Sequence, residues 1–332
     1  MIIYNDFIYY CDSYPAIGNG HLNRCIDITD FIVSSRPDIS IAIMGQFSNS
    51  AEKFLDNMDR NNLPVLKPFI TGISAKVTML DTLVAPGDVD KIDIQKAKFL
   101  KSISTKLFVI NIGYNTFVPS VVDAIINYVP ITQYSGNNSF KRYFGLDFAP
   151  VTREFFNNDN KSDLGYDVMA IIGGCQEQYG PEIIAKSLSQ FQDKKIGIIV
   201  SPHFPYNEYK LLALKYPIIS FFQNVKSIKE YIHDSKAIIC TYGNTTYESI
   251  AMGKPTFVVA YFEFQYKFAE YLEKDGIVRN LGELKKLNNI TNDIFNERVL
   301  TELSNNCSQK IKSPGIENIG KLIIGDINDL SK

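Results

Sequence analysis

Short runs of β-branched and aromatic residues alternate with helix-forming patterns along almost the whole chain, and this alternation limits its fold more than any other feature. It predicts βαβ units, in which helices join parallel strands. In the first half, the runs that predict strands are Phe7–Cys11, Ile39–Met44, Lys106–Ile112 and Pro130–Tyr134. The segments that predict helices are Gly20–Ser34, Ala51–Arg60, Ile92–Ser104 and Pro119–Tyr128.

The alternation restarts in the second half of the chain, which predicts a second domain of the same kind. The runs that predict strands there are Asp167–Ile172, Lys195–Val200, Ile218–Phe221, Ala237–Thr241 and Thr256–Ala260. The segments that predict helices are Pro181–Gln190, Tyr206–Lys215, Val225–Asp234, Thr245–Met252 and Tyr266–Asp275.

A polar stretch, Asn157–Asp163, separates the two halves and is typical of a linker. A length of 332 residues also favours two domains, at about 150 residues each. We therefore expect an α/β protein with a Rossmann-like domain over residues 1–156, a second over 164–315 and a C-terminal helix over 316–332. Two doubly wound domains are expected to leave a ligand-binding cleft at the carboxyl ends of their strands.

Composition and charge exclude several classes of protein. Hydrophobic residues make up 45% of the chain and charged residues 21%, which is the balance of a globular protein rather than a disordered one. The chain has 34 basic and 36 acidic side chains, and without a basic excess we expect no nucleic-acid partner. Apolar stretches such as Pro255–Tyr261 are far shorter than the ~18 residues of a membrane-spanning helix, so no transmembrane segment is expected.

The N-terminus and the cysteines together predict a cytoplasmic protein. Residues Met1–Asp6 have neither the basic region nor the long apolar region of a secretion signal. The five cysteines are odd in number and none forms a Cys-x-x-Cys pair, which favours reduced thiols over disulfides or a structural zinc site.

The segment after the first predicted strand contains the pattern Gly-x-Gly-His-x-x-Arg and opens the first helix. Gly18 and Gly20 allow the backbone to approach a ligand closely, and the helix N-terminus behind them attracts an anion. His21 stands at the start of this helix and can act as a general base near neutral pH. The alternative interpretation is a glycine turn in which the histidine only bonds a local carbonyl group.

A second glycine pair, Gly173 and Gly174, follows the first strand of the second half. Paired glycines in this position suit a diphosphate laid over the backbone. A plain turn between a strand and a helix is the alternative.

The segment Tyr242–Ser249 turns a strand into a helix through Gly243 and Asn244. The first turn of this helix carries the hydroxyl groups of Thr245 and Thr246, which can hold a phosphate oxygen together with the free N–H groups. Tyr242 precedes the turn and belongs to the same predicted binding segment.

Glu248 lies one turn into this helix and can accept two hydrogen bonds from a ribose diol. In the alternative interpretation, Thr245 caps the helix and Glu248 completes its capping box. Glu263 and Gln265, in the loop after the next strand, have the polarity to bind sugar hydroxyls or a base edge, although a solvated loop would have the same composition.

Asp88-Val89-Asp90 has the spacing of an Asp-x-Asp metal motif, but it follows a Pro-Gly turn and precedes a helix, where aspartate is an ordinary cap. The sequence offers no other cluster of acids or histidines, so we expect no catalytic metal and no cofactor besides the substrate nucleotide. His203 and His233 are expected to be structural or solvated.

Several motifs resemble those of known proteins of sugar metabolism. Gly18–Cys25 resembles the Gly-x-Gly-His-x-x-Arg-Cys signature of the UDP-sugar hydrolase of pseudaminic acid biosynthesis and of related spore-coat polysaccharide proteins. Phe148–Phe155 resembles a segment at the domain junction of that family. Tyr242–Pro255 is similar to a Gly-Gly-Ser-Thr-x-x-Glu stretch of MurG-type glycosyltransferases, and Glu263 and Gln265 stand where that superfamily has an acid or amide followed by glutamine.

This resemblance implies the GT-B fold, which consists of two Rossmann-like domains. It also implies roles by position. His21 would be the catalytic histidine, Gln265 would bind the sugar or the base, and Glu248 would bind the ribose of UDP. The residues that would hold the diphosphate are Gly173, Gly174, Asn244 and Thr245. The acid that the hydrolase family has at the end of a first-domain strand is matched by an amide, Asn111.

Three functions are compatible with these features. The leading hypothesis is a metal-independent, GT-B-type glycosyltransferase of surface-glycan or nonulosonate-like sugar biosynthesis, with a nucleotide sugar, most simply UDP-linked, as donor and His21 as general base. A hydrolase would use the same site with water as acceptor. A binding subunit without catalytic activity would keep the phosphate site and would not need His21.

Overall fold

The computed structural model of the chain describes residues 3–14, 20–57, 63–85, 88–113, 115–129, 133–137, 139–157, 165–173, 179–201, 204–308 and 310–332. The chain forms two compact units. Unit 1 comprises Met1–Thr152 and Pro314–Lys332, and unit 2 comprises Arg153–Ser313. Most of the predicted linker, residues 158–163, lies outside the described residues.

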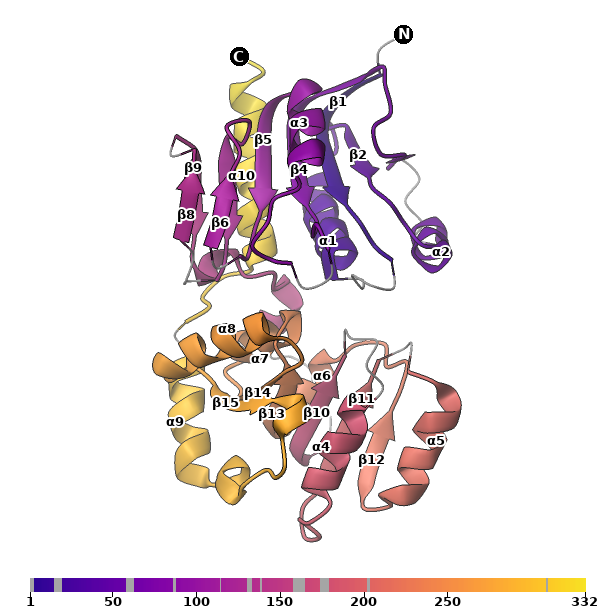
Figure 1. Cartoon of the computed structure of the whole chain (residues 1–332), viewed down its shortest axis with the longest axis vertical. Helices are drawn as coiled ribbons and strands as arrows, with labels where there is room; N and C mark the ends of the chain where they lie inside the picture. The colour runs from indigo at the N-terminus through magenta and orange to yellow at the C-terminus, as the bar shows by residue number, and fades with distance from the viewer. Residues whose placement is uncertain are drawn as a thin grey trace. The chain divides into compact units, whose positions relative to one another are not determined.

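Unit 1 is built on a parallel sheet with the strand order β3-β2-β1-β4-β5-β7-β9 (Figure 1). These strands are β1 (Ile3–Cys11), β2 (Ile41–Met44), β3 (Val65–Leu66), β4 (Ile73–Asp81), β5 (Ser104–Ile110), β7 (Ala124–Asn127) and β9 (Lys141–Phe144). A separate parallel pair consists of β6 (Asn115–Val118) and β8 (Gln133–Gly136). In β1, the run Phe7–Cys11 is buried throughout, as expected of a central strand covered on both faces.

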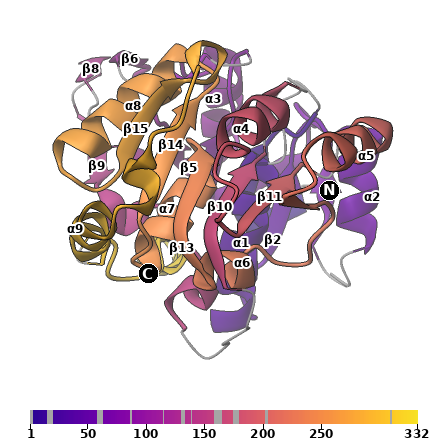
Figure 2. The same ribbon diagram turned by 90° about the horizontal axis from the view of Figure 1, so that it is seen from below.

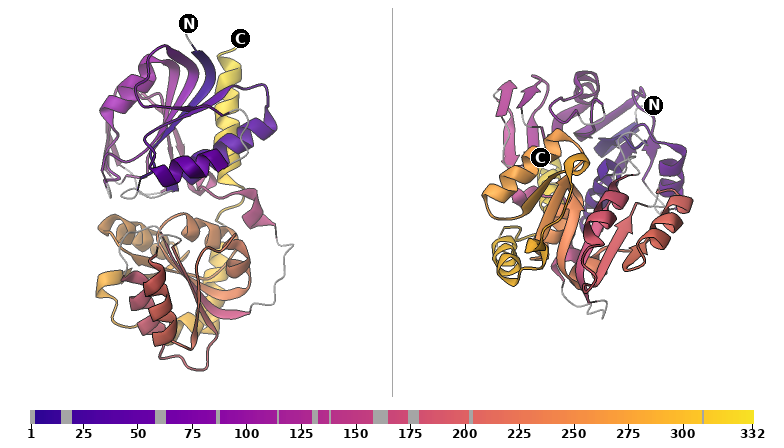
Figure 3. Two further views of the ribbon diagram at one scale, coloured as in Figure 1. Left: turned by 90° about the vertical axis from the view of Figure 1, so that its right-hand side faces the viewer. Right: turned by 60° about the horizontal axis from the view of Figure 1, so that its bottom comes forward.

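The helices of unit 1 cover both faces of this sheet. They are α1 (Gly20–Ser35), α2 (Asn49–Asn57), α3 (Ile94–Ser102) and α10 (Gly315–Asp329). The chain leaves β1 toward β2 through α1, but it leaves β4 in the opposite direction through α3. Because crossovers between parallel strands are right-handed, this reversal places α1 and α3 on opposite faces of the sheet, as Figures 1 and 3 show.

Helix α10 comes from the end of the chain and packs beside α1 (Figure 3). Its buried residues Ile316, Ile319, Ile323 and Ile327 recur every three or four positions, which is the spacing of one helix face. Gly320 belongs to the same face, and a Cβ atom there would lie 2.3 Å from the ring of Phe31 on α1. The absence of a side chain at Gly320 therefore lets the two helices approach closely.

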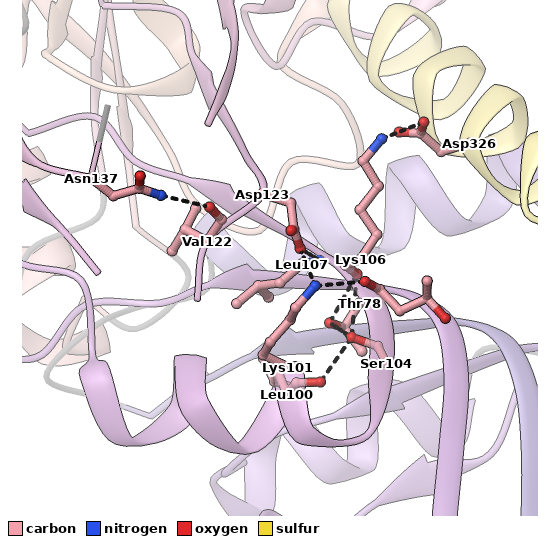
Figure 4. Close-up of polar contacts among 11 residues, drawn as sticks. Thr78, Leu100, Lys101, Ser104, Lys106, Leu107, Val122, Asp123, Asn137 and Asp326 are labelled. Atoms are coloured by element: carbon pink, nitrogen blue, oxygen red, sulfur yellow. Dashed lines mark hydrogen bonds and ion pairs between the residues drawn. The ribbon is translucent and has the colours of Figure 1, made fainter. Parts of the chain in front are cut away.

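Polar contacts tie α10 and α3 to the sheet (Figure 4). Lys106 on β5 forms an ion pair of 2.5 Å with Asp326 on α10. Lys101 at the end of α3 donates to Asp123, which also accepts a 2.7 Å hydrogen bond from the backbone N–H of Leu107. These contacts lie toward the amino ends of the strands, opposite the edge formed by their carboxyl ends.

Unit 2 repeats the doubly wound plan with the parallel strand order β12-β11-β10-β13-β14-β15. These strands are β10 (Tyr166–Ile172), β11 (Ile196–Val200), β12 (Ile219–Phe222), β13 (Ser235–Thr241), β14 (Thr256–Ala260) and β15 (Arg279–Glu283). The helices are α4 (Gly180–Leu188), α5 (Tyr206–Lys215), α6 (Lys229–His233), α7 (Asn244–Ala251), α8 (Glu263–Lys274) and α9 (Glu297–Cys307). Helices α4 and α5 lie along one face of the sheet (Figure 2).

The expected α/β class with parallel sheets is confirmed, and most elements of unit 2 begin and end within three residues of the predicted ones. In unit 1, the helix expected at Pro119–Tyr128 is wrong, because this segment contains β7. Strands β3, β4, β6 and β9 were not predicted. Gln133 and Tyr134 begin β8, and the rest of the strand expected at Pro130–Tyr134 lies outside the described residues. The run Ala124–Asn127 is too short for its apolar pattern to separate a buried strand from a helix.

Two of the glycines of α10, Gly320 and Gly325, provide a matched test of this packing. Gly320→Ala is expected to destabilise the protein by about 1–3 kcal/mol, because its Cβ would overlap the Phe31 ring. Gly325→Ala has open space around its Cβ and is expected to stabilise the helix by about 0.5–1 kcal/mol. Chemical denaturation of the two variants measures both changes, and a Gly320→Ala variant as stable as Gly325→Ala would contradict the close packing of α1 and α10.

Candidate functional site

The strand order of unit 1 reverses direction between β1 and β4, and ligands of doubly wound sheets bind at such a reversal. The two strands end side by side, because Cys11, the last residue of β1, is paired with Asp81, the last residue of β4. Helix α1 begins after this edge at Gly20, so its first turn and Asp81 meet at the carboxyl ends of the strands.

His21 and Arg24, on the first turns of α1, both bond the carboxylate of Asp81. The Nδ1 atom of His21 lies 2.7 Å from Oδ1 of Asp81. Arg24 donates from Nε to Oδ2 at 2.7 Å and from Nη2 to Oδ1 at 2.5 Å, so the two side chains form a bidentate ion pair. The side chain of Asp81 is 1% exposed and that of His21 is 14% exposed, so the carboxylate is buried and the imidazole retains access from outside.

Two tyrosines complete this cluster. Tyr9 on β1 donates to Oδ2 of Asp81 at 2.7 Å, and Arg24 donates from Nη1 to the hydroxyl group of Tyr128 at 3.0 Å. Burial by itself raises the pKa of a carboxyl group, but the charge of Arg24 and the hydrogen bonds from Arg24 and His21 hold the pKa of Asp81 well below its usual range. Asp81 is therefore an ionised, buried carboxylate that is bonded by His21, Arg24 and Tyr9.

A second buried carboxylate lies at the same edge. Asp12, directly after β1, accepts hydrogen bonds from the backbone N–H of Gln46 at 2.8 Å and from the hydroxyl of Thr82 at 2.6 Å. It also forms a 2.8 Å ion pair with Lys96 on α3, and none of these groups belongs to the His21 cluster. Two buried ion pairs, Asp81–Arg24 and Asp12–Lys96, are thus described at this edge, and His21 contacts the first of them.

In unit 2 the strand order reverses between β10 and β13, where the chain offers its predicted phosphate-binding turns. The hydroxyl of Thr241, the last residue of β13, donates to the carbonyl of Gly173 after β10 at 3.2 Å, so the two turns lie beside each other. A Cβ atom added at Gly173 would meet nothing within 4 Å, and the same is true of Gly20 in unit 1. Among the described residues, no atom packs where a side chain would begin at these two glycines, so a ligand could approach the backbone there.

The start of α7 is shaped by its own capping interactions. Gly243 is the N-cap, and its N–H donates to the hydroxyl of Thr246 at 3.3 Å. Thr246 is fully buried, and Tyr242 is buried with its hydroxyl bonded to that of Tyr247. Thr246 and the Tyr242 side chain therefore support the turn, whereas Asn244 and Thr245, both half-buried, present the first N–H groups of the helix.

The remaining predicted residues lie on α7 and α8. Glu248 is half-buried on α7, and it is not the capping-box partner, because Thr246 holds that position. Gln265 accepts hydrogen bonds from the N–H groups of Tyr261 and Phe262 and donates to the carbonyl of Tyr242, so it ties the start of α8 to the end of β13. Glu263 is 79% exposed and forms a surface ion pair with Lys267.

The described residues include no group of three or more His, Cys, Asp and Glu side chains that could hold a metal ion. Asp88 pairs with Lys91, and Asp90 accepts a hydrogen bond from the backbone of Asn115. Asn111 bonds Val89, Gly113 and Thr116, so it joins the segment after β5 to the loop between β4 and α3.

Sequence reasoning missed Asp81, which is the acid that the histidine contacts. It was missed because β4 was not predicted, and the expected strand-end acid was placed one strand later, at Asn111. The pattern Val77–Leu80 followed by an acid was the available signal. Two of the predicted site residues, Gly18 and Gly174, lie outside the described part of the chain. His203, which was expected to be structural or solvated, also lies outside it.

No protein-family model matches this chain. An uncharacterized protein of Methanocaldococcus jannaschii is 22% identical over 288 residues, which cover 79% of this chain and 57% of that protein. A Helicobacter pylori protein, named pseudaminic acid cytidylyltransferase and UDP-2,4-diacetamido-2,4,6-trideoxy-beta-L-altropyranose hydrolase, is 22% identical over 270 residues, which cover 81% of this chain and 47% of that protein. The chain thus spans about half the length of these two relatives.

Solved structures resemble the chain over nearly its whole length. MurG of Acinetobacter baumannii has a TM-score of 0.64 at 10% identity and covers 96% of this chain and 99% of its own. A putative UDP-N-acetylglucosamine 2-epimerase of Listeria monocytogenes has a TM-score of 0.57 at 10% identity, with 98% and 96% covered. The glycotransferase of kitacinnamycin has a TM-score of 0.57 at 11% identity, with 97% and 99% covered. The chain therefore has the GT-B fold.

Among the described helices, none combines the length and the apolar content that crossing a membrane would require.

The buried carboxylate predicts a specific dependence of stability on pH. Asp81→Asn is expected to lower the free energy of unfolding at pH 7 by about 3–5 kcal/mol, because Arg24 would keep a buried charge without its partner. Unfolded aspartate has a pKa of about 3.9. Since the folded pKa lies lower, the unfolded state takes up the proton first, and the contribution of Asp81 is complete above pH ~5 and is lost as the pH falls through this range.

Denaturant titrations between pH 7 and pH 3 measure this effect. The wild type should lose stability more steeply below pH ~5 than Asp81→Asn does. Asp38→Asn, which removes an exposed pair with Arg36, should follow the wild-type curve. Parallel curves for wild type and Asp81→Asn would contradict the ionised state of Asp81.

Proposed function

We propose that the chain is an enzyme that transfers the sugar of a nucleotide sugar, most simply a UDP-sugar, to a hydroxyl acceptor in surface-glycan or nonulosonate-like sugar biosynthesis. The observation that carries this proposal is the position of His21, a partly exposed imidazole bonded to the buried carboxylate of Asp81 where the strand order of unit 1 reverses. The GT-B fold and the 22% identity to a protein named as a UDP-sugar hydrolase support a nucleotide sugar as substrate.

In the proposed reaction, His21 takes the proton of the acceptor hydroxyl as the acceptor oxygen bonds the anomeric carbon of the sugar. The bond between this carbon and the diphosphate oxygen breaks, and its electron pair leaves with the nucleoside diphosphate. A general base contributes about 10²–10⁴ in rate. The developing negative charge on the diphosphate needs positive potential, which oriented N–H groups can supply.

Unit 2 is the proposed nucleotide-binding part. The start of α7 offers N–H groups at Asn244 and Thr245 and the positive end of a helix dipole. Gly173 lies beside this turn with open space around its Cα. We therefore propose that these backbone groups, rather than a metal ion, stabilise the diphosphate.

A nucleotide-sugar hydrolase is the second candidate, and one comparison favours it specifically. The Helicobacter pylori relative carries a hydrolase in its name. A water molecule in place of the acceptor hydroxyl would give up its proton to His21 in the same way, so the two candidates differ in the acceptor and not in the base.

Nucleotide release from a panel of UDP-, dTDP- and GDP-sugars tests the proposal. We expect release with at least one UDP-sugar, undiminished by EDTA, and dependent on added glycan or cell extract. Nucleotide release from a nucleotide sugar without any added acceptor would identify the hydrolase instead. Binding without release under any condition would refute both enzymes, and EDTA-sensitive release restored by magnesium would refute the metal-independent mechanism.

With the substrate so identified, His21→Ala is expected to bind the nucleotide normally and to lose turnover by about 10²–10⁴. His233→Ala is the matched control. His233 also pairs with a neighbouring carboxylate, Asp234 at 2.8 Å, but it lies before β13, at the amino end of that strand. Near-normal turnover in folded His21→Ala protein would remove the histidine from the mechanism.

Glu248→Ala tests the proposed ribose contact. Loss of hydrogen bonds to a charged group costs about 1.5–3 kcal/mol, so the affinity for UDP should fall about 10–100-fold. Glu302→Ala, an exposed glutamate on α9, serves as the control that should leave affinity unchanged. Calorimetric titration with UDP measures both, and an unchanged affinity of Glu248→Ala together with lower thermal stability would make this carboxylate a structural group.

A further inference from the structure

We propose that Asp81 and Arg24 are positioning residues for His21: Asp81 fixes the imidazole as the tautomer protonated on Nδ1, and Arg24 fixes the carboxylate of Asp81 and offsets its charge beside the ring. The catalytic meaning of this arrangement rests on the proposed function. The tautomer and the charge state are properties of the protein itself and can be measured without substrate.

The tautomer follows from which atoms can donate. An ionised carboxylate only accepts hydrogen bonds, and both oxygens of Asp81 are engaged by Arg24, while Tyr9 also donates to Oδ2. The 2.7 Å contact between Oδ1 and Nδ1 of His21 therefore requires the proton to be on Nδ1. In the neutral imidazole this leaves Nε2 without a proton, and Nε2 is then the basic atom.

Arg24 approaches the same ring nitrogen, with Nη2 at 3.1 Å from Nδ1. A guanidinium group has no acceptor, so Arg24 cannot replace Asp81 as the partner of a protonated Nδ1. Its two bonds to Asp81 fix the plane and the position of the carboxylate instead. Asp81 therefore orients the imidazole ring, and Arg24 orients Asp81.

The second step concerns charge. A carboxylate alone beside an imidazole favours the protonated, cationic ring, which cannot act as a base. Here the carboxylate and the guanidinium together carry no net charge, and both lie within hydrogen-bond distance of the same ring nitrogen. The imidazole therefore keeps the orienting hydrogen bond without the full electrostatic pull of an isolated anion.

The other titratable groups of this cluster do not disturb this balance. Among the described residues, those beside Asp81 and Arg24 include Tyr9, Cys11, Cys25 and Tyr128. Burial raises the pKa of both tyrosines and of the Cys11 thiol, so these groups are neutral at physiological pH. Asp12 at the same strand edge is neutralised by Lys96.

Nitrogen-15 NMR of the histidine rings tests the tautomer directly in the wild-type protein. The chain has three histidines, and the signals of His21 are those missing from His21→Gln. Above the pH at which the ring loses its second proton, we expect Nδ1 to show the shift of a protonated nitrogen and Nε2 that of an unprotonated one. The opposite pattern, or an even mixture of tautomers, would overturn the proposal even if the enzyme is active.

Substitutions at Asp81 test its positioning role. Asp81→Asn is expected to lose the fixed tautomer and to lower kcat by about 10²–10⁴ with KM little changed, as loss of an orienting carboxylate does in other His-dependent enzymes. Asp12→Asn is the matched control, because it removes an equally buried carboxylate from the same edge and should leave the His21 tautomer unchanged. A folded Asp81→Asn protein that keeps the tautomer would overturn the proposal.

Substitutions at Arg24 test the charge balance. Arg24→Gln leaves Asp81 without its counter-charge, so the ring should hold its second proton to higher pH, by about one to two pH units. The acid limb of the pH–turnover profile and the NMR titration should shift together. Arg24→Lys keeps the positive charge, so its titration should lie close to that of the wild type. An unshifted titration in folded Arg24→Gln would contradict the role of Arg24. If Arg24→Gln does not fold, the titration of Arg24→Lys and the tautomer in the wild-type spectrum still test the proposal. Absence of any turnover would refute the proposed function and leave the spectroscopic result standing.

Discussion

The ion pair of Asp81 and Arg24 is the interaction on which unit 1 depends most. It joins the end of β4 to the second turn of α1, and through Tyr9 and Tyr128 it reaches β1 and the segment after β7. Two charges buried this completely are stable only because each satisfies the other. Any movement of α1 away from the sheet would separate them, so the pair fixes the helix start at the strand edge.

Unit 2 achieves a comparable rigidity without buried charge. The end of β13 is held by the hydroxyl of Thr241 on the Gly173 carbonyl and by the amide of Gln265 on the Tyr242 carbonyl. The buried hydroxyl of Thr246 accepts a hydrogen bond from the N–H of Gly243 in the same turn. These hydrogen bonds fix the backbone of the turn at the start of α7. The first N–H groups of the helix have no intrahelical partner, which suits the proposed binding of phosphate by backbone groups rather than side chains.

The sequence was sufficient to predict the α/β class, both doubly wound halves and the position of His21 at the start of α1. It was insufficient where the local pattern is ambiguous. The segment Ile73–Asp81 mixes Ser, Lys and Thr with apolar residues, yet it is a central strand because α10, some 240 residues later, covers it. Since Asp81 ends that strand, missing the strand also hid the partner of the histidine. Tyr242, Thr246 and Gln265 were predicted to bind a ligand from their place in turns after strands and from the resemblance of those segments to known motifs. Their hydrogen bonds to neighbouring groups could be seen only in three dimensions.

The return of α10 to unit 1 gives the chain an unusual order of assembly. The ribosome synthesises all of unit 2 before α10, which packs against α1 and β4. Domains generally fold as units while they are being made. Unit 2 can therefore complete its fold during translation, whereas unit 1, which begins first, exposes the apolar face meant for α10 until the final helix has emerged.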